Sequence, residues 1–238
     1  MSSVQEPDKE PAWRRRKAQR APEILVAARA VFEESGFEGA SLAEVGRRAE
    51  VSEATVYKYF NNKQDLVRQV IRSWMEPYLE RLERELRLLD TARSRLTFLA
   101  GRHLDAMHAA PGLHRLVYRE LRWSDYQGSA LHQLNQRYSD IVKWIFAEAM
   151  ASGELRADLD PRLARDMLFG ALEHVGWRMV FDGQSGDIEA AAHALIGNIL
   201  IGMAAPKARD DDVQHRIVER LETIVERLGA QAPASGPN

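Results

Sequence analysis

The sequence of 238 residues contains no cysteine. This absence excludes disulfide bonds, thiol catalysis and thiolate metal sites. The amino-terminal segment also lacks the apolar stretch of an export signal. The longest run without a charged residue, 190–206, contains two glycines and is shorter than the roughly 20 apolar residues of a bilayer-spanning helix. We interpret this run as a buried helix and expect a soluble, cytoplasmic protein without membrane contacts.

Motifs of the common enzyme classes are missing as well. The sequence has neither a glycine-rich loop that would cradle a phosphate nor a G-x-S-x-G nucleophile motif. Its seven histidines are scattered, and His103 and His108 are five positions apart, a spacing that places them on different faces of a helix. We therefore expect a protein that is not an enzyme and has no catalytic residues, metal ligands or cofactor.

Charge is distributed unevenly along the chain. The formal net charge is −2, but residues 11–63 hold ten basic and seven acidic side chains. This segment therefore carries +3 and the rest of the chain −5. A basic head on an acidic body suits a protein that presents one end to nucleic-acid phosphates.

Apolar residues recur at helical spacing along the chain, and no segment shows the alternation of a strand. The pattern predicts an all-α fold in which a three-helix amino-terminal head precedes a larger helical body. A first helix is expected to begin near Pro22 and to end at Gly36. Proline and glycine then mark the breaks between the body helices, which are predicted at 62–88, 92–109, 111–123, 128–152, 160–182, 187–204 and 211–228.

Segment 41–66, SLAEVGRRAEVSEATVYKYFNNKQDL, has the pattern of two short helices joined by a tight turn. Ser41 precedes Glu44 by three positions, which is the spacing of a capping box at a helix start. Val56 and Phe60 give the second helix one apolar face and leave two tyrosines and a lysine directed outward. An ordinary bundle helix does not need tyrosines on its outer surface, whereas the recognition helix of a helix-turn-helix presents such residues.

This segment resembles the DNA-binding module of TetR/AcrR-type transcriptional repressors, whose signature T-[VLI]-Y-x-[YH]-F-x-x-K-x-x-L is matched by TVYKYFNNKQDL. Together with the upstream ILVAARAVFEESGFEGASL, the resemblance covers about residues 20–70. It implies a homodimeric regulator, expected to be a repressor, that binds a palindromic double-stranded DNA operator and is released by a small, mostly apolar effector. The implied divisions are a disordered basic arm (1–19), a helix-turn-helix DNA-binding domain (20–66), a helical ligand-binding and dimerisation domain (67–228) and a disordered tail (229–238).

The resemblance also assigns DNA contacts to individual positions of this sequence. The second short helix would enter the major groove, while the residues that flank it would contact phosphates. For Glu53, a role at the helix start is the alternative to accepting a hydrogen bond from a cytosine amine. The basic run 14–17 would reach a neighbouring minor groove or the backbone. The predicted DNA-binding residues are Ser41, Glu53, Ala54, Thr55, Tyr57, Lys58, Tyr59 and Lys63.

Two positions depart from the family pattern. Glu50 stands in the turn where glycine is usual, and a non-glycine residue in the left-handed conformation costs about 1 kcal/mol. Gly46 replaces the usual alanine in the preceding helix, again at a cost of about 1 kcal/mol. We expect a slightly altered turn on an intact core.

The body is larger than DNA binding requires. The two consecutive helices predicted at 160–182 and 187–204 are largely apolar, so most of their surface must pack against other helices. This pattern predicts a twofold four-helix dimer interface. Aromatic and histidine side chains of the body predict a mostly apolar effector cavity, although each residue alone is more typical of ordinary core. The predicted interface residues are Leu168, Leu172, Val175, Met179, Leu195 and Ile199. The predicted cavity residues are Trp74, Tyr78, His103, Met107, Tyr118, Trp123, Trp144, His174 and Trp177.

The competing hypothesis is a helical adaptor or scaffold protein without specific DNA binding. A gel-shift assay with the DNA upstream of the protein's own gene distinguishes the two, because phosphate contacts make binding steeply dependent on salt. The helix predicted at 211–228 would either pack against the body or extend the dimer contact.

Overall fold

The computed structural model describes residues 12–121, 126–181, 186–204 and 218–222. Helices account for nearly all of these residues, and a bridge between Leu155 and Ala204 is the one β-type pairing among them. The all-α prediction is therefore confirmed. The labelled helices are α1 (Ala12–Gly39), α2 (Leu42–Arg48), α3 (Glu53–Tyr59), α4 (Lys63–Leu86), α5 (Ala92–Ala109), α6 (Pro111–Leu121), α7 (Ala130–Ala151), α8 (Pro161–Phe181) and α9 (Ile188–Ile201).

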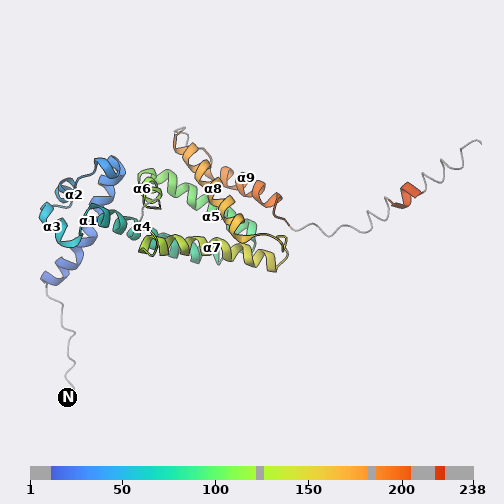
Figure 1. Cartoon of the computed structure of the whole chain (residues 1–238), viewed down its shortest axis with the longest axis horizontal. Coiled ribbons are helices and arrows are strands. Elements are labelled where there is room, and N and C mark those ends of the chain that lie inside the picture. The colour runs from blue at the N-terminus through green and yellow to red at the C-terminus, as the bar shows by residue number, and fades with distance from the viewer. Residues whose placement is uncertain (1–11, 122–125, 182–185, 205–217, 223–238) are drawn as a thin grey trace, which may run out of the picture.

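Helices α1, α2 and α3 form the head at one end of the molecule, and α4 runs from the head into the body (Figure 1). The core of the head combines Phe32 of α1, Val45 of α2 and Val56 of α3, each at most 1% exposed. A core this small stabilises three helices only weakly on its own. The packing of α1 on both α4 and α6 therefore completes the head.

The amino-terminal part of α1 differs from the prediction. The helix begins at Ala12 and includes Pro22, so it takes in residues 12–19 of the segment expected to be a disordered arm. Apart from Trp13, this stretch consists of arginine, lysine, alanine and glutamine, and all four have high helix propensity, which offsets the one hydrogen bond that Pro22 cannot donate. Gly36 has a φ of 65° and interrupts the helical geometry where the helix was expected to end.

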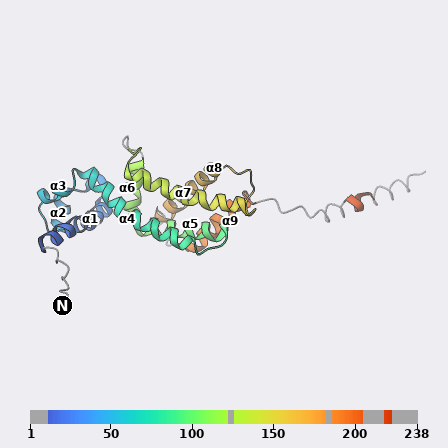
Figure 2. The ribbon, with the colours of Figure 1, turned by 90° about the horizontal axis from the view of Figure 1, so that it is seen from below.

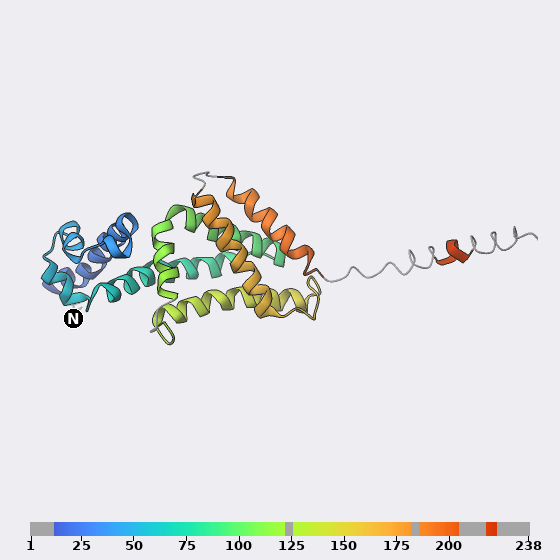
Figure 3. The ribbon, with the colours of Figure 1, turned by 45° about the horizontal axis from the view of Figure 1, so that its top comes forward.

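Helix α5 forms the centre of the body, with α7, α8 and α9 packed against it. Figure 2 shows α6 as a short helix between the head and the body. In Figure 3, α8 crosses in front of α5 and reaches α7. Buried side chains of head and body belong to one continuous hydrophobic core. Helices α4 and α6 both contact α1 of the head and α5 of the body.

The body helices predicted between residues 62 and 204 agree with α4 to α9, with ends that differ by at most about three residues. The agreement follows from local chemistry, since Asn62, Thr91, Ser129 and Asp187 each accept a backbone hydrogen bond as an N-cap. The predicted helix at 211–228 lies largely outside the described residues. Within the described ranges, every helix is too short or too polar to cross a membrane.

Candidate functional site

Helix α3 is positioned with one face buried and the other exposed. Ser52 caps its start by accepting a hydrogen bond from the backbone N–H of Thr55 at 3.1 Å. Val56 and Phe60 are at most 1% exposed and fasten the helix to the head. Tyr57, by contrast, is 53% exposed, although burial of its aromatic ring would stabilise the folded protein. Packing within the head therefore leaves the outer face of α3 available to a partner.

The eight predicted DNA-binding residues divide into two groups by exposure. Ser41, Glu53, Ala54, Tyr57 and Lys58 are exposed, whereas the other three are half-buried. The predicted DNA contacts of all eight stay predictions, but the exposed five have side chains that reach solvent without any rearrangement. The half-buried residues are Thr55, Tyr59 and Lys63.

Each half-buried residue already has a contact inside the head. The hydroxyl of Thr55 lies 2.9 Å from that of Ser52, so it takes part in the cap. Lys63 donates to the carbonyl oxygen of Glu38 at 3.3 Å, and its ammonium lies 4.5 Å from the centre of the Phe37 ring. Lys63 therefore joins the start of α4 to the end of α1 while retaining further N–H donors for a phosphate.

The two departures from the family pattern lie in the turn between α2 and α3 and in the helix that precedes it. Glu50 has a φ of 54°, so it adopts the left-handed conformation that was expected to cost free energy. A Cβ atom at Gly46 would lie 2.9 Å from the carbonyl oxygen of Val51 and 3.2 Å from the backbone nitrogen of Glu53. The glycine thus allows α2 to approach the turn closely, and the backbone N–H of Val51 donates to the carbonyl oxygen of Gly46 at 2.9 Å.

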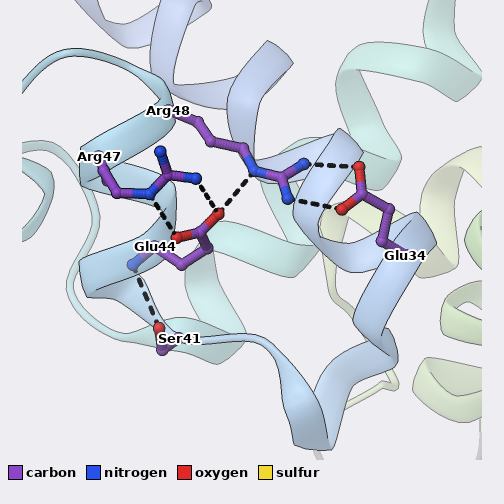
Figure 4. A network of polar contacts seen from close by, with 5 residues as sticks. All are labelled: Glu34, Ser41, Glu44, Arg47 and Arg48. Atoms are coloured by element: carbon purple, nitrogen blue, oxygen red, sulfur yellow. Dashed lines mark hydrogen bonds and ion pairs between the residues drawn. The ribbon is translucent and has the colours of Figure 1, made fainter.

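The arginines of α2 are held by carboxylates of the head itself. Figure 4 shows Glu44 accepting hydrogen bonds from Arg47 and Arg48, while Arg48 also binds Glu34 of α1 at 2.6 and 2.5 Å. Hydrogen bonds from Arg47 and Arg48 lower the pKa of Glu44 to about 2. Ser41 accepts from the backbone N–H of Glu44 and completes the network. Arg48 therefore orients α2 on α1, and both arginines are paired with carboxylates.

The body contains a cavity of about 390 Å³ between α4, α5, α6, α7 and α8. This volume lies in the ordinary range of small-molecule sites. Four of the nine predicted cavity residues line it: Trp74, Tyr78, His103 and Tyr118. The remaining lining residues are Met75, Ala106, His114, Val117, Leu121, Asn135, Tyr138, Ser139, Arg165, Asp166, Phe169, Gly170 and Glu173.

A polar cluster lies on the wall of this cavity. His103 Nδ1 is 3.0 Å from the hydroxyl of Tyr138, and the two rings stack with centroids 5.9 Å apart. Burial, with a smaller contribution from nearby His114, lowers the pKa of His103 to about 3. Burial also raises the pKa of Tyr138 well above its ordinary value and that of Tyr78 to about 12. All three side chains are therefore uncharged near neutral pH.

Four other predicted cavity residues lie elsewhere. Met107 is fully buried beside Gly176 in the contact of α5 with α8, and Trp144 lies on a separate groove between α4 and α7. His174 and Trp177 border a shallow surface hollow on α8, and His174 bonds the carbonyl oxygen of Gly170. These four residues do not line this cavity, because helical spacing does not show which apolar face turns inward. Trp123 lies outside the described residues.

Two cavity residues that the sequence analysis missed are central to the polar cluster. Tyr138 lies in the predicted helix 128–152, four and seven positions before buried apolar residues, and this spacing placed it on the inner face. His114 is 6% exposed and its Nδ1 lies 3.2 Å from the carbonyl oxygen of Ala110. His114 is the fourth residue of its helix, and the surrounding sequence has no pattern that predicts its burial.

The predicted dimer residues also fall into two groups. Leu168 and Leu172 are fully buried inside the subunit, so they are not surface residues and that part of the prediction is corrected. They turn inward because their face of α8 packs on α5 and α7. The other four predicted residues are half-buried: Val175, Met179, Leu195 and Ile199. The exposed apolar side chains of α8 and α9 are Leu163, Met167, Phe181 and Ile201, each at least 50% exposed.

Helix α6 joins the cavity to the head through a buried carboxylate. Glu120 is 2% exposed and accepts hydrogen bonds from Gln64, from Arg68 Nε at 3.2 Å and from Arg119 Nη1 at 3.1 Å. The guanidinium of Arg119 also lies 3.4 Å from the centre of the Phe37 ring of α1. A buried carboxylate with several donors is fixed in position, since removing any donor leaves it unsatisfied.

The opposite end of α6 is packed directly on the backbone of α1. A Cβ atom at Gly112 would lie 2.8 Å from both the Cα and the carbonyl oxygen of Glu33. His114, Val117 and Tyr118 of the same helix line the cavity. Helix α6 therefore connects the lining of the cavity to α1.

Family comparisons cover the head and the body separately. Residues 24–70 match the family described as bacterial regulatory proteins, tetR family, and residues 71–202 match the YsiA-like protein, C-terminal region. The fatty acid metabolism regulator protein of Bacillus subtilis is 27% identical over 182 residues, which cover 76% of this chain and 94% of that protein. The transcriptional repressor KstR2 of Mycolicibacterium smegmatis is 25% identical over 165 residues, with 67% of this chain and 77% of the repressor covered.

Solved structures agree with these matches. FadR from Bacillus subtilis, in complex with stearoyl-CoA, has a TM-score of 0.66 at 27% identity and is similar over 75% of this chain and 97% of its own. FadR from Bacillus halodurans, a fatty acid degradation regulator, has a TM-score of 0.65 at 25% identity, over 75% of this chain and 97% of its own. The chain therefore belongs to the TetR family and is a DNA-binding transcriptional regulator of the helix-turn-helix type, not an enzyme.

Proposed function

We propose that the protein is a homodimeric repressor that binds a pseudo-palindromic DNA operator and is released by a small, mostly apolar effector. The observation that carries this proposal is the outer face of α3, where Tyr57 and Lys58 are exposed while Val56 and Phe60 anchor the helix. Such a helix fits the major groove of one half-site. Binding to chromosomal operators would place the protein in the cytoplasm.

Dimerisation is supported by the exposed apolar side chains of α8 and α9. Leu163, Met167 and Phe181 recur at helical spacing on one face of α8, and Ile201 is exposed on α9. Exposed apolar side chains grouped on neighbouring helices favour a protein interface. Two copies of this surface, related by a twofold axis, would form a four-helix contact and set the two α3 helices about 34–36 Å apart, one turn of duplex DNA.

The cavity and the relatives together support an acyl thioester as the effector class. The cavity is lined mainly by aromatic and apolar side chains of five helices. FadR from Bacillus subtilis, to which this chain is similar over most of its length, binds stearoyl-CoA in its crystal structure. A bound acyl group would press on Val117 and Tyr118 of α6, and α6 would shift α1 and α4 and so alter the spacing of the two heads.

A fluorescence anisotropy titration tests this proposal directly. The probe is labelled DNA from upstream of the protein's own gene, and the competitor is the same length of unrelated DNA. We expect tighter binding to the upstream DNA, and the logarithm of the affinity should fall linearly with the logarithm of the salt concentration. A long-chain acyl-CoA should release this DNA. Equal affinity for both DNAs would favour the adaptor or scaffold hypothesis instead.

Analytical ultracentrifugation tests the oligomeric state. We expect a dimer at micromolar concentration for the unmodified protein and a monomer for a variant with Met167→Glu and Phe181→Glu. Both side chains are at least 50% exposed, so the charges do not disturb the core of the subunit. A monomer for the unmodified protein would contradict the dimer proposal.

A further inference from the structure

The cavity wall includes a polar atom that is buried without a hydrogen bond. His103 is 9% exposed, lines the cavity and uses Nδ1 for its contact with Tyr138. Its Nε2 is inaccessible to solvent and has no hydrogen-bond partner among the described residues. The hydroxyl of Tyr78, on the same wall, is also inaccessible to solvent, but it interacts with the hydroxyl of Tyr138. Unsatisfied buried polar atoms are rare in folded proteins because each one destabilises the fold.

The two ring nitrogens of His103 have linked roles. Because burial keeps the ring neutral, one nitrogen carries a proton and donates while the other accepts. If the hydroxyl of Tyr138 donates to Nδ1, Nε2–H is a donor toward the cavity. If Nδ1–H donates to the hydroxyl, Nε2 becomes an acceptor. The pair can therefore satisfy either a carbonyl oxygen or a hydroxyl group of a bound molecule.

The charged side chains of the lining disfavour an anion near this pair. Arg165 is the one arginine or lysine among the lining residues, and its Nη2 lies 2.6 Å from the carboxylate of Asp166. Its Nη1 also donates to the hydroxyl of Ser139 at 3.1 Å. Asp166 and Glu173 contribute two carboxylates to the same lining. A negatively charged group in the cavity would thus face two carboxylates and one compensated cation.

The surrounding rings favour a flat or extended apolar skeleton. Trp74 and Tyr78 stack with centroids 5.7 Å apart, and Phe169 packs edge-on against Tyr138 at 5.0 Å. A charged substituent would be buried here without a free counter-ion, which is unfavourable. The substituent that an apolar molecule brings to His103 should therefore be uncharged.

We propose that the effector carries an uncharged oxygen, as a hydroxyl or a carbonyl, on its apolar part, and that a shift of the lining side chains on binding brings this oxygen to Nε2 of His103, with Tyr138 as the positioning partner. An unsubstituted straight acyl chain would leave Nε2 unsatisfied and would bind more weakly. The inference rests on the proposed function, because it assigns a chemical feature to the effector of the same cavity.

A matched ligand series tests this inference on the full-length protein. The reference probe is dodecanoyl-CoA, and the test probes carry one hydroxyl or keto oxygen at C3, C8 or C12 of the same chain. We expect at least one oxygenated probe to bind about tenfold more tightly than dodecanoyl-CoA in isothermal titration calorimetry. In His103→Phe the ratio between the affinity for this oxygenated probe and the affinity for dodecanoyl-CoA should fall to less than about threefold.

Two controls separate binding from folding. His103→Phe removes an unsatisfied buried atom but also the partner of the Tyr138 hydroxyl, so the ligand-free variant should melt within about five degrees of the unmodified protein. Tyr138→Phe keeps the ring but removes the hydroxyl, and it should also reduce the gain from the oxygen. If both variants keep the full gain, or if dodecanoyl-CoA binds as tightly as every oxygenated probe, the inference is overturned while the proposed effector class stands. If no thioester binds or releases the operator DNA, the proposed effector class fails and the inference fails with it.

Discussion

The polar side chains described in the head and in the body differ in solvent exposure and in charge. In the head, Glu44 forms exposed ion pairs with Arg47 and Arg48, and these charges persist because they remain in water. In the body, His103 and Tyr138 are buried against each other and are neutral because burial disfavours their charged forms. The comparison separates a surface suited to a charged polymer from a cavity suited to an uncharged group.

A similar contrast exists at α3 between two aromatic residues, the exposed Tyr57 and the buried Phe60, which is the C-cap of the helix. Phe60 is 1% exposed, and Phe60→Ala should destabilise the protein by about 3–5 kcal/mol because it empties part of the head core. Operator binding should be lost along with the fold of the head. Urea denaturation measures the stability change. A loss below 1 kcal/mol would show that the head core does not depend on this ring.

Tyr57 supplies the matched opposite case, since it is 53% exposed. The double variant Tyr57→Ala and Lys58→Ala should weaken operator binding about a hundredfold and leave the melting temperature within one or two degrees, because base and phosphate contacts contribute about 1–3 kcal/mol each. Anisotropy titration and thermal melting provide the two readouts. Unchanged affinity together with lower stability would mean that these side chains pack rather than bind.

The body should respond to pH through His103. Its pKa is about 3 in the folded protein and 6.5 in the unfolded chain, so the unfolded chain binds more protons between these values. Stability should therefore fall as the pH falls below about 6.5, by at most about 1.4 kcal/mol per pH unit. Between pH 6 and 4.5 the unmodified protein should lose about 2 kcal/mol more than His103→Phe. Parallel stability curves for the two proteins would contradict a buried, neutral histidine.

The turn of the head offers a smaller test. Gly46→Ala should destabilise the protein by about 1 kcal/mol although alanine favours helices, because the new Cβ would lie 2.9 Å from the carbonyl oxygen of Val51. Gly170→Ala is the control, since a Cβ there has no neighbour within 4 Å and should stabilise α8 by about 0.5–1 kcal/mol. Stabilisation by both substitutions would show that α2 does not need the close approach.

The success of sequence-based prediction follows the same division between head and body. The outward face of α3 was predictable because Val56 and Phe60 are four positions apart and determine the orientation of a seven-residue helix. The cavity was only partly predictable, because its wall combines five helices whose relative rotations depend on tertiary packing. Trp144 and His174 have the composition expected of a cavity residue but lie on outer faces, and Leu168 was assigned to the surface although it packs inward.

The central claim is that the exposed face of α3 enters the grooves of duplex DNA. DNase I footprinting of the region upstream of the protein's own gene tests it most directly, with the unmodified protein and the Tyr57→Ala, Lys58→Ala variant side by side. The account predicts two protected half-sites one helical turn apart for the unmodified protein and no protection by the variant at the same concentration. Equal protection by both proteins, or the absence of any protected site, would contradict it.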